Sequence, residues 1–238
     1  MIKNYFKTAW RNLLRNKVYS LINITGLSIG LACCMLILLY NNDEVSYDRF
    51  NANAKNIYRI TNTRVGADGK VQGTNGITGM MPGPSFKAAI PEIKEYVRFQ
   101  GEQLTVKVGT EVFQQEASYV DDNFFNVFSF KLKEGNKDAV LKDLYSVVLN
   151  EEVAKNFFGT SNNVVGKTIE LPLSVDHDAP NPADKFQTFT VSGVVPVSPQ
   201  NSSIKIQMLL PMKLNLRPGV ADNQWINFYL NGVIAVTN

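Results

Sequence analysis

Cysteine and histidine are scarce in this chain of 238 residues. The two cysteines, Cys33 and Cys34, are adjacent in the most apolar segment, so disulfides cannot staple the roughly two hundred residues that follow. The only histidine, His177, lies in the polar run SVDHDAPNPADK between two aspartates, which we expect to be a solvated loop, because a stable metal site needs several fixed ligands. No acid pair or nucleophile-base pair stands out either. We therefore expect no catalytic residue, no cofactor and no metal.

A net positive charge is absent after residue 17. The first 17 residues carry five basic side chains and no acidic one, whereas the remaining 221 residues carry 19 basic and 21 acidic side chains. No basic stripe remains that would bind nucleic acid, so we expect no nucleic-acid partner.

A glycine is missing from the one segment that resembles a phosphate-binding loop. Gly166-Lys167-Thr168 has the form of the end of a P-loop, but the position five residues before Gly166 is Ser161 instead of glycine. The following residues, KTIELPL, alternate between apolar and polar and contain a proline, which predicts a strand where a P-loop needs a helix. We expect a loop between a helix and a strand, without nucleotide.

Charge is absent from 23 consecutive residues, Val18 to Tyr40. As a helix they would extend about 35 Å, enough to cross a hydrocarbon core of about 30 Å. Five basic residues precede the span and NNDEVSYD follows it, so the positive-inside rule predicts a cytoplasmic N-terminus and an extracytoplasmic remainder. We expect a retained membrane anchor. The alternatives are a cleaved signal peptide, which is usually shorter, and a lipoprotein signal, whose consensus around Cys33 or Cys34 is imperfect.

The residues before the span predict an amphipathic helix in the lipid headgroup layer. Apolar residues recur on one face, and basic residues step along the other every four positions. The alternative is a helix packed on a soluble partner. The residues that we expect at the membrane interface are Lys3, Lys7, Trp10, Arg11 and Arg15.

Small residues within the span are spaced for helix packing. Gly26, Gly30 and Cys34 are four residues apart, and Asn23 precedes them as a polar contact. We expect another membrane helix to approach this face, although small residues are common in membrane helices and the spacing also arises by chance.

The remainder alternates short strands with short helices, which predicts an α+β fold: an N-terminal amphipathic helix and one transmembrane helix, followed by a mixed α/β extracytoplasmic domain. We expect Asp121 or Asp122 to cap a short helix whose phenylalanines fill the core. We expect the final strand to lack a neighbour on one side. The domain boundaries are 1–17, 18–40 and 41–238. The expected strands are 57–65, 93–100, 103–108, 111–119, 145–150, 167–173 and 185–197, with a turn at 67–70 and helices at 84–90, 138–143 and 151–159.

The order of several motifs is similar to that of a known family. These motifs are KTAWRNLLRNK, LINITGLSIGLACC, SYDRFN, IYRIT, FFNVFSF, VVLNEEVAKNFFG, VGKTIEL, FTVSGVV and PQNSSIKIQMLLP. Together, from residue 1 to about residue 230, they resemble the FtsX-like ABC transporter permeases that carry a MacB-type periplasmic core domain.

The resemblance implies a function and partners. The span would be the first of four transmembrane helices, and the following domain would be porter-like. A separate cytoplasmic ABC ATPase would drive motion of the periplasmic part, for export or for handling of lipoproteins or peptides. A second permease copy is the other partner that the resemblance implies, and a bacterial inner membrane is the implied location. Membrane lipid is the partner that the basic amphipathic helix itself predicts.

The chain departs from that pattern because no further apolar segment of 18 residues follows the span. We therefore interpret it as the N-terminal portion of a permease, with a core domain that is incomplete at its C-terminus. The alternative is a single-span, membrane-anchored binding or scaffold protein.

Overall fold

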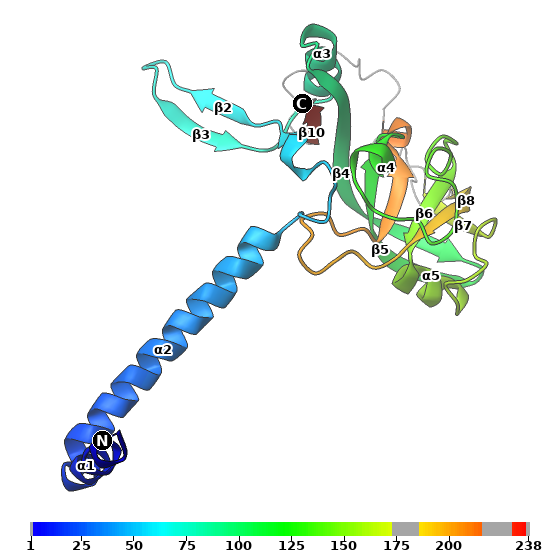
Figure 1. The fold of residues 1–238 in the computed structure, drawn as a ribbon. Helices are drawn as coiled ribbons and strands as arrows, with labels where there is room; N and C mark the ends of the chain where they lie inside the picture. The colour runs from blue at the N-terminus through cyan, green and yellow to red at the C-terminus, as the bar shows by residue number, and fades with distance from the viewer. Residues whose placement is uncertain (1, 173–185, 216–229, 237–238) are drawn as a thin grey trace. The chain divides into compact units, whose positions relative to one another are not determined.

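The computed structural model describes residues 2–172, 186–215 and 230–236 (Figure 1). The chain divides into two compact units, Met1–Tyr47 and Asp48–Asn238. The first unit is helical, and the second is a mixed α/β domain built around a sheet. The α+β fold class predicted from the sequence is confirmed. His177 lies outside the described residues.

The first unit consists of two helices, α1 (Ile2–Arg15) and α2 (Lys17–Ser46). They are separated by a single residue, Asn16, whose backbone is not helical (φ −110°, ψ 57°). The hydroxyl of Ser20 donates to the carbonyl oxygen of Leu13 across this break, at 3.1 Å. Helix α2 is long and apolar enough to cross a membrane, and it continues six residues beyond the predicted span, which ends at Tyr40.

The second unit is organised by an eight-stranded sheet in the order β1-β10-β4-β5-β9-β6-β8-β7. The pairs β5–β9 and β6–β8 are parallel, and the others are antiparallel. Strand β7 also meets β4 at Glu170 and Lys107, so the six strands from β4 to β7 close on themselves. The strands of this sheet are β1 (Ile57–Arg59), β4 (Ile93–Val108), β5 (Glu111–Val120), β6 (Ser146–Asn150), β7 (Thr168–Pro172), β8 (Phe186–Val195), β9 (Met208–Pro211) and β10 (Asn231–Val236).

Short helices and one hairpin complete the unit. The hairpin, β2 (Asn62–Val65) with β3 (Val71–Asn75), forms a separate sheet that extends from the body of the domain (Figure 1). Its turn confirms the predicted reversal at 67–70. The helices are η1 (Ala54–Asn56), α3 (Pro82–Ala89), α4 (Phe124–Val127), α5 (Glu151–Phe158) and η3 (Met212–Asn215).

Five predicted elements were wrong in detail. The strand expected at 57–65 is interrupted between β1 and β2, and the strands expected at 93–100 and 103–108 are the single strand β4, which pairs with β5 through Gly101. Residues 138–143 form turns instead of a helix, because the side chains of Asn136 and Asp143 accept hydrogen bonds from backbone N–H groups two residues later. The last predicted strand, 185–197, corresponds to β8 and has neighbours on both sides, since β8 lies between β6 and β7. Strand β10, which was not predicted, lies between β1 and β4.

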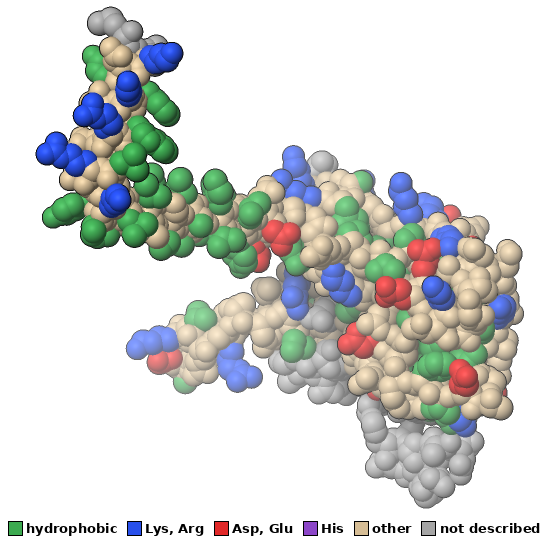
Figure 2. Space-filling model, turned by 90° about the horizontal axis from the view of Figure 1, so that it is seen from below, with side chains coloured by type: hydrophobic (Ala, Val, Ile, Leu, Met, Phe, Trp, Pro, Cys, Tyr) green, Lys and Arg blue, Asp and Glu red, His purple; other side chains and the backbone are tan. Residues whose placement is uncertain are grey.

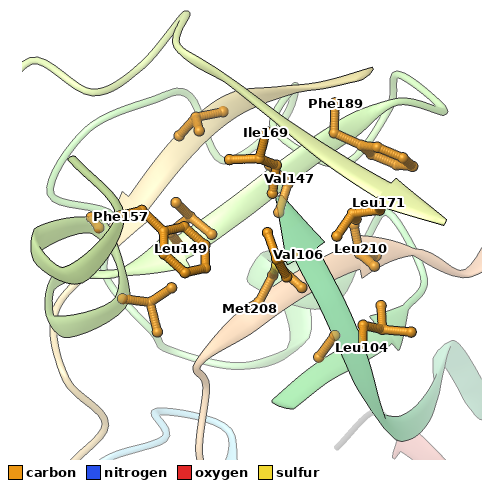
Figure 3. Packing of buried hydrophobic residues seen from close by; sticks show 14 of the residues in the cluster. Leu104, Val106, Val147, Leu149, Phe157, Ile169, Leu171, Phe189, Met208 and Leu210 are labelled. Carbon is orange, nitrogen blue, oxygen red and sulfur yellow. The ribbon is translucent and has the colours of Figure 1, made fainter. Parts of the chain in front are cut away.

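Two hydrophobic clusters lie on opposite faces of the sheet. Strand β6 is buried along its whole length, so its alternate side chains serve both clusters: Val147 and Leu149 face the first, and Val148 faces the second. Figure 3 shows the first cluster, to which strands β4, β6, β7 and β9 each contribute residues two positions apart, and in which Phe157 of α5 lies beside Leu149. The second cluster contains the α4 phenylalanines, so the prediction that these aromatics fill the core is confirmed.

The prediction that Asp121 or Asp122 caps α4 was wrong. Asn123 occupies the cap position, without a side-chain hydrogen bond to the helix. The carboxylate of Asp121 instead binds Arg98 of β4, whose NH2 group lies 2.6 Å from Oδ1. A charged guanidinium is a stronger partner for a carboxylate than the N–H of a one-turn helix.

Candidate functional site

Helix α1 carries the residues that we predict at a membrane interface. Lys3, Lys7, Arg11 and Arg15 are exposed, and so is Trp10, at 58% of its full surface. Figure 2 shows the basic side chains gathered on this helix, with hydrophobic side chains beside them. Exposed aromatic and basic groups side by side suit the boundary between headgroups and acyl chains. The contact with lipid stays a prediction.

Helix α2 has no buried residue, and hydrophobic side chains cover it in Figure 2. Two of its hydroxyl groups are satisfied within the helical unit, since Thr25 donates to the carbonyl oxygen of Leu21 and Ser20 donates to that of Leu13. Apolar side chains and hydroxyl groups paired with the backbone are compatible with a lipid environment.

The predicted packing stripe lies on one face of α2. Asn23, Gly26, Gly30 and Cys34 are spaced by three and four residues, which places them along the same side of the helix. A Cβ atom added at Gly26 or Gly30 would meet nothing within 4 Å. The stripe is therefore available to another membrane helix, and its packing role stays a prediction.

A set of residues that sequence reasoning missed lies directly after α2. Asp48 has a left-handed backbone (φ 56°), and its N–H donates to the carbonyl oxygen of Asn201 at 2.9 Å. Its Oδ1 accepts from the N–H of Ser203, also at 2.9 Å. Residues 48 and 201–203 are thus joined although more than 150 positions separate them. Aspartate tolerates the left-handed region better than most residues, which explains its presence here.

Asn51 extends this network to a third segment. Its side chain is 6% exposed, its Nδ2 donates to the carbonyl oxygen of Asp48 at 3.2 Å, and its Oδ1 accepts from the N–H of Ser129 at 2.9 Å. The hydroxyl of Ser129 in turn accepts from the N–H of Ala52 at 2.9 Å. The rings of Phe50 and Phe130 pack edge to face beside these bonds, with their centroids 5.1 Å apart. We call Asp48, Asn51, Ser129 and Ser203 the exit clamp.

The exit clamp brings together three of the motifs that carried the family resemblance. Asp48 and Asn51 belong to SYDRFN, Ser129 belongs to FFNVFSF, and Ser203 belongs to PQNSSIKIQMLLP. The sequence contained a signal for this site, because a short run of aspartate and asparagine after a helix favours a turn fastened by side chains. It contained no signal for which distant segments the turn would bind.

The P-loop-like segment has the predicted structure of a loop between a helix and a strand. Gly159 ends α5 in a left-handed conformation (φ 73°), and Gly166 turns the chain (φ 90°) before β7 begins at Thr168. The Nζ of Lys167 lies 4.9 Å from the ring centroid of Phe158. Among the residues that the structure describes, no three histidine, cysteine, aspartate or glutamate side chains are grouped to hold a metal ion.

Comparison with known proteins gives a family match over most of the chain. Residues 20–234 match the family model described as the MacB-like periplasmic core domain. A search of curated proteins found no match.

Solved structures are similar in fold. A domain of a permease protein from Porphyromonas gingivalis aligns with a TM-score of 0.64 at 20% identity, over 79% of this chain and 76% of the other. The extracellular domain of the noncanonic ABC-type transporter YknZ from Gram-positive bacteria aligns with a TM-score of 0.50 at 12% identity, over 77% and 84%. The periplasmic region of MacB from Actinobacillus actinomycetemcomitans gives 0.49 at 19% identity, over 77% and 75%. At such identities, the first of these likenesses establishes the fold of the second unit.

Proposed function

The chain belongs to the MacB-like periplasmic core domain family, and from this premise we propose that it is a permease subunit, or the N-terminal portion of one, of an ABC transporter. In this proposal a cytoplasmic ATPase hydrolyses ATP, and α2 passes the resulting motion to the extracytoplasmic domain. This motion serves export, or the handling of lipoproteins or peptides.

The exit clamp is the observation that carries the proposal. Asp48 follows the end of α2 at Ser46 by only two residues, and hydrogen bonds then fasten it to residues 201–203. Asn51 fastens the same turn to Ser129, which follows α4. A flexible linker would absorb a displacement of the helix, whereas a bonded turn passes it on to the segments that it holds.

The membrane arrangement is part of the same proposal. The basic residues of α1 favour a cytoplasmic N-terminus in a bacterial inner membrane, where they lie near anionic lipid. The small residues at 26, 30 and 34 favour close packing of α2 with a membrane helix of a second permease copy.

The proposal is tested with the permease that contains this chain, reconstituted in liposomes with its ATPase. We expect the permease to bind the ATPase and to stimulate its turnover. Asn51→Ala removes the side-chain oxygen that accepts the hydrogen bond from the N–H of Ser129. We expect the variant to bind the ATPase as before, but to stimulate its turnover about tenfold less, which lies within the range of about 1–3 kcal/mol for coupling between two sites. Asn53→Ala is the matched control, since Asn53 is exposed and two positions away.

A permease that neither binds an ATPase nor changes its turnover would contradict the proposal. The chain would then be better described as a membrane-anchored binding or scaffold protein. Equal losses from Asn51→Ala and Asn53→Ala would leave the permease assignment in place but remove the exit clamp as its coupling element.

A further inference from the structure

A pocket of about 340 Å³ lies beside the exit clamp, within the second unit. Its volume is at the lower end of the range for small-molecule sites, about 300–1,000 Å³. Three of the clamp residues, Asp48, Asn51 and Ser203, line it, and Arg59 of β1 adds a basic side chain. The remaining lining residues are apolar: Ala54, Ile57, Phe99, Phe128 and Ile204.

The apolar side of the pocket is the uncovered margin of the second hydrophobic cluster. Phe128 is a buried member of that cluster, and Ile57, Phe99 and Ile204 are half-buried and pack against it. An apolar group that entered the pocket would therefore contact the domain core directly and would remove these side chains from water.

The polar side of the pocket carries one acidic and one basic side chain. Asp48 is held by the N–H of Ser203, and the NH2 group of Arg59 donates to the carbonyl oxygen of Gly76 at 3.2 Å. Both charges are therefore fixed by backbone groups, and their sum is zero. Such a rim suits a ligand head that carries both signs of charge, more than one with a single strong charge.

Covalent connectivity keeps the pocket near the outer leaflet. From Tyr40, where the predicted span ends, α2 continues for six residues, about 9 Å. Two further residues reach Asp48, which adds at most about 7 Å. A residue that lines the pocket thus lies within roughly 16 Å of the end of the hydrocarbon-spanning run, and the headgroup layer itself occupies about 5–7 Å of that distance.

We propose that this pocket binds one alkyl chain of a zwitterionic membrane lipid, such as a phosphatidylethanolamine, drawn partly out of the outer leaflet. The chain packs on Phe99, Phe128 and Ile204, and the head lies against Asp48 and Arg59. The pocket shares its walls with the exit clamp, so an occupying lipid contacts the turn that follows α2. This inference depends on α2 being in the membrane and does not depend on the proposed ATPase partner.

The test uses the full chain in nanodiscs that contain a phosphatidylethanolamine with a photoreactive diazirine in its acyl chain. After irradiation, adducts are mapped by mass spectrometry of peptides. We expect adducts on peptides that contain Phe99 and Ile204, about tenfold above those on peptides that contain Val112 and Val165. These valines, 59% and 45% exposed, are surface apolar residues of the same domain that do not line the pocket.

A variant pair sharpens the test. Ile204→Glu places a charge in the apolar side, and we expect it to reduce the Phe99 adduct about tenfold while adducts on α2 stay unchanged. Val165→Glu is the matched control and should leave both unchanged, with circular dichroism checking the fold of each. Adducts confined to α2, or equal adducts on the pocket and valine peptides, would overturn the lipid site. Absence of adducts on α2 as well would overturn the membrane span together with it.

Discussion

Arg98 donates three hydrogen bonds of 3.0 Å or less to the carboxylate of Asp121, one from its backbone N–H at 2.7 Å and two from its guanidinium at 2.6 and 3.0 Å. Each side chain is only 13% exposed. The pair fastens β4 to the end of β5, beside the ring of Tyr96, which lies 5.5 Å from the guanidinium carbon. It is the most buried of the ion pairs found among the described residues.

Replacing Asp121 with alanine should destabilise the domain by about 3 kcal/mol, because the guanidinium of Arg98 would remain buried without its partner. Urea unfolding of the protein in detergent, followed by circular dichroism, measures the loss. Lys70→Ala is the control: its partner Asp68 lies at 3.9 Å, with the two side chains 84% and 58% exposed, so we expect a change of at most about 0.5 kcal/mol. Equal losses would contradict this account.

Tyr119 should make the domain sensitive to alkaline pH. Burial raises the pKa of its hydroxyl above the usual value, and the nearby carboxylate of Glu102 raises it further. The unfolded chain releases this proton near pH 10, while the folded chain retains it, so stability is constant below about pH 10 and falls above it.

The loss approaches about 1.4 kcal/mol per pH unit above pH 10 for one such group. Unfolding free energies at pH 8 and pH 11 should therefore differ more for the wild type than for Tyr119→Phe. Tyr58→Phe, at an exposed tyrosine, is the control and should resemble the wild type. Parallel pH dependence of the wild type and Tyr119→Phe would show that another group controls alkaline unfolding.

Two glycines should respond differently to replacement by alanine. Gly159 ends α5 with φ 73°, and Gly101 lies within β4; a Cβ at either position would meet nothing within 4 Å. Gly159→Ala should cost about 1 kcal/mol, because only the backbone conformation opposes it. Gly101→Ala should be neutral or stabilise by up to about 1 kcal/mol, because it restricts the unfolded chain. Thermal unfolding of the two variants side by side decides the matter, and a loss at Gly101 equal to that at Gly159 would refute the distinction.

The helix-packing stripe predicts a specific loss of association. Gly26→Leu combined with Gly30→Leu should reduce recovery of an untagged permease copy with a tagged one by about tenfold, since close approach of two helices depends on small residues. The free space at both positions means that the variant's own helix is undisturbed. Ala32→Leu, on the other side of α2, is the control and should leave recovery unchanged. Unaltered recovery of the double variant would exclude the stripe as a contact.

The position of α1 is accessible through Trp10. Once Trp225 is replaced by phenylalanine, Trp10 is the sole tryptophan. We expect lipids labelled with a quencher near the headgroup to quench its fluorescence more strongly than lipids labelled near the chain end, because interfacial helices bury their apolar face only about 5–10 Å. Insensitivity to either lipid would favour packing on a soluble partner instead.

Sequence reasoning found what depends on local pattern. The period of apolar residues predicted α1, the length of the uncharged run predicted α2, and the polar turn predicted the β2–β3 hairpin. It failed where distant partners decide. Asp121 is a residue type that often caps helices, but its carboxylate binds the guanidinium of Arg98, 23 positions earlier, instead of the N–H groups of α4. Gly101 reads as a break in a strand, yet the ladder with β5 continues through it.

The exit clamp shows the same limit at the candidate site. The residues Asp48 and Asn51 stand in a motif that could be quoted from the sequence, but their partners at 129 and 201–203 are set by the packing of the whole domain. Local chemistry predicts that such a turn is fastened, and only the tertiary structure identifies what fastens it.

The place of β10 in the sheet has a consequence for biosynthesis. Val97 of β4 pairs with Val233, and Tyr58 of β1 pairs with Ile234. Strands β1 and β4 are therefore synthesised long before the strand that pairs with both of them. At a translation rate of about 5–20 residues per second, β1 and β4 stay without this neighbour for several seconds or more. During export such a nascent chain exposes unpaired backbone on both strands, and a factor that shields them until residue 236 emerges would favour correct assembly.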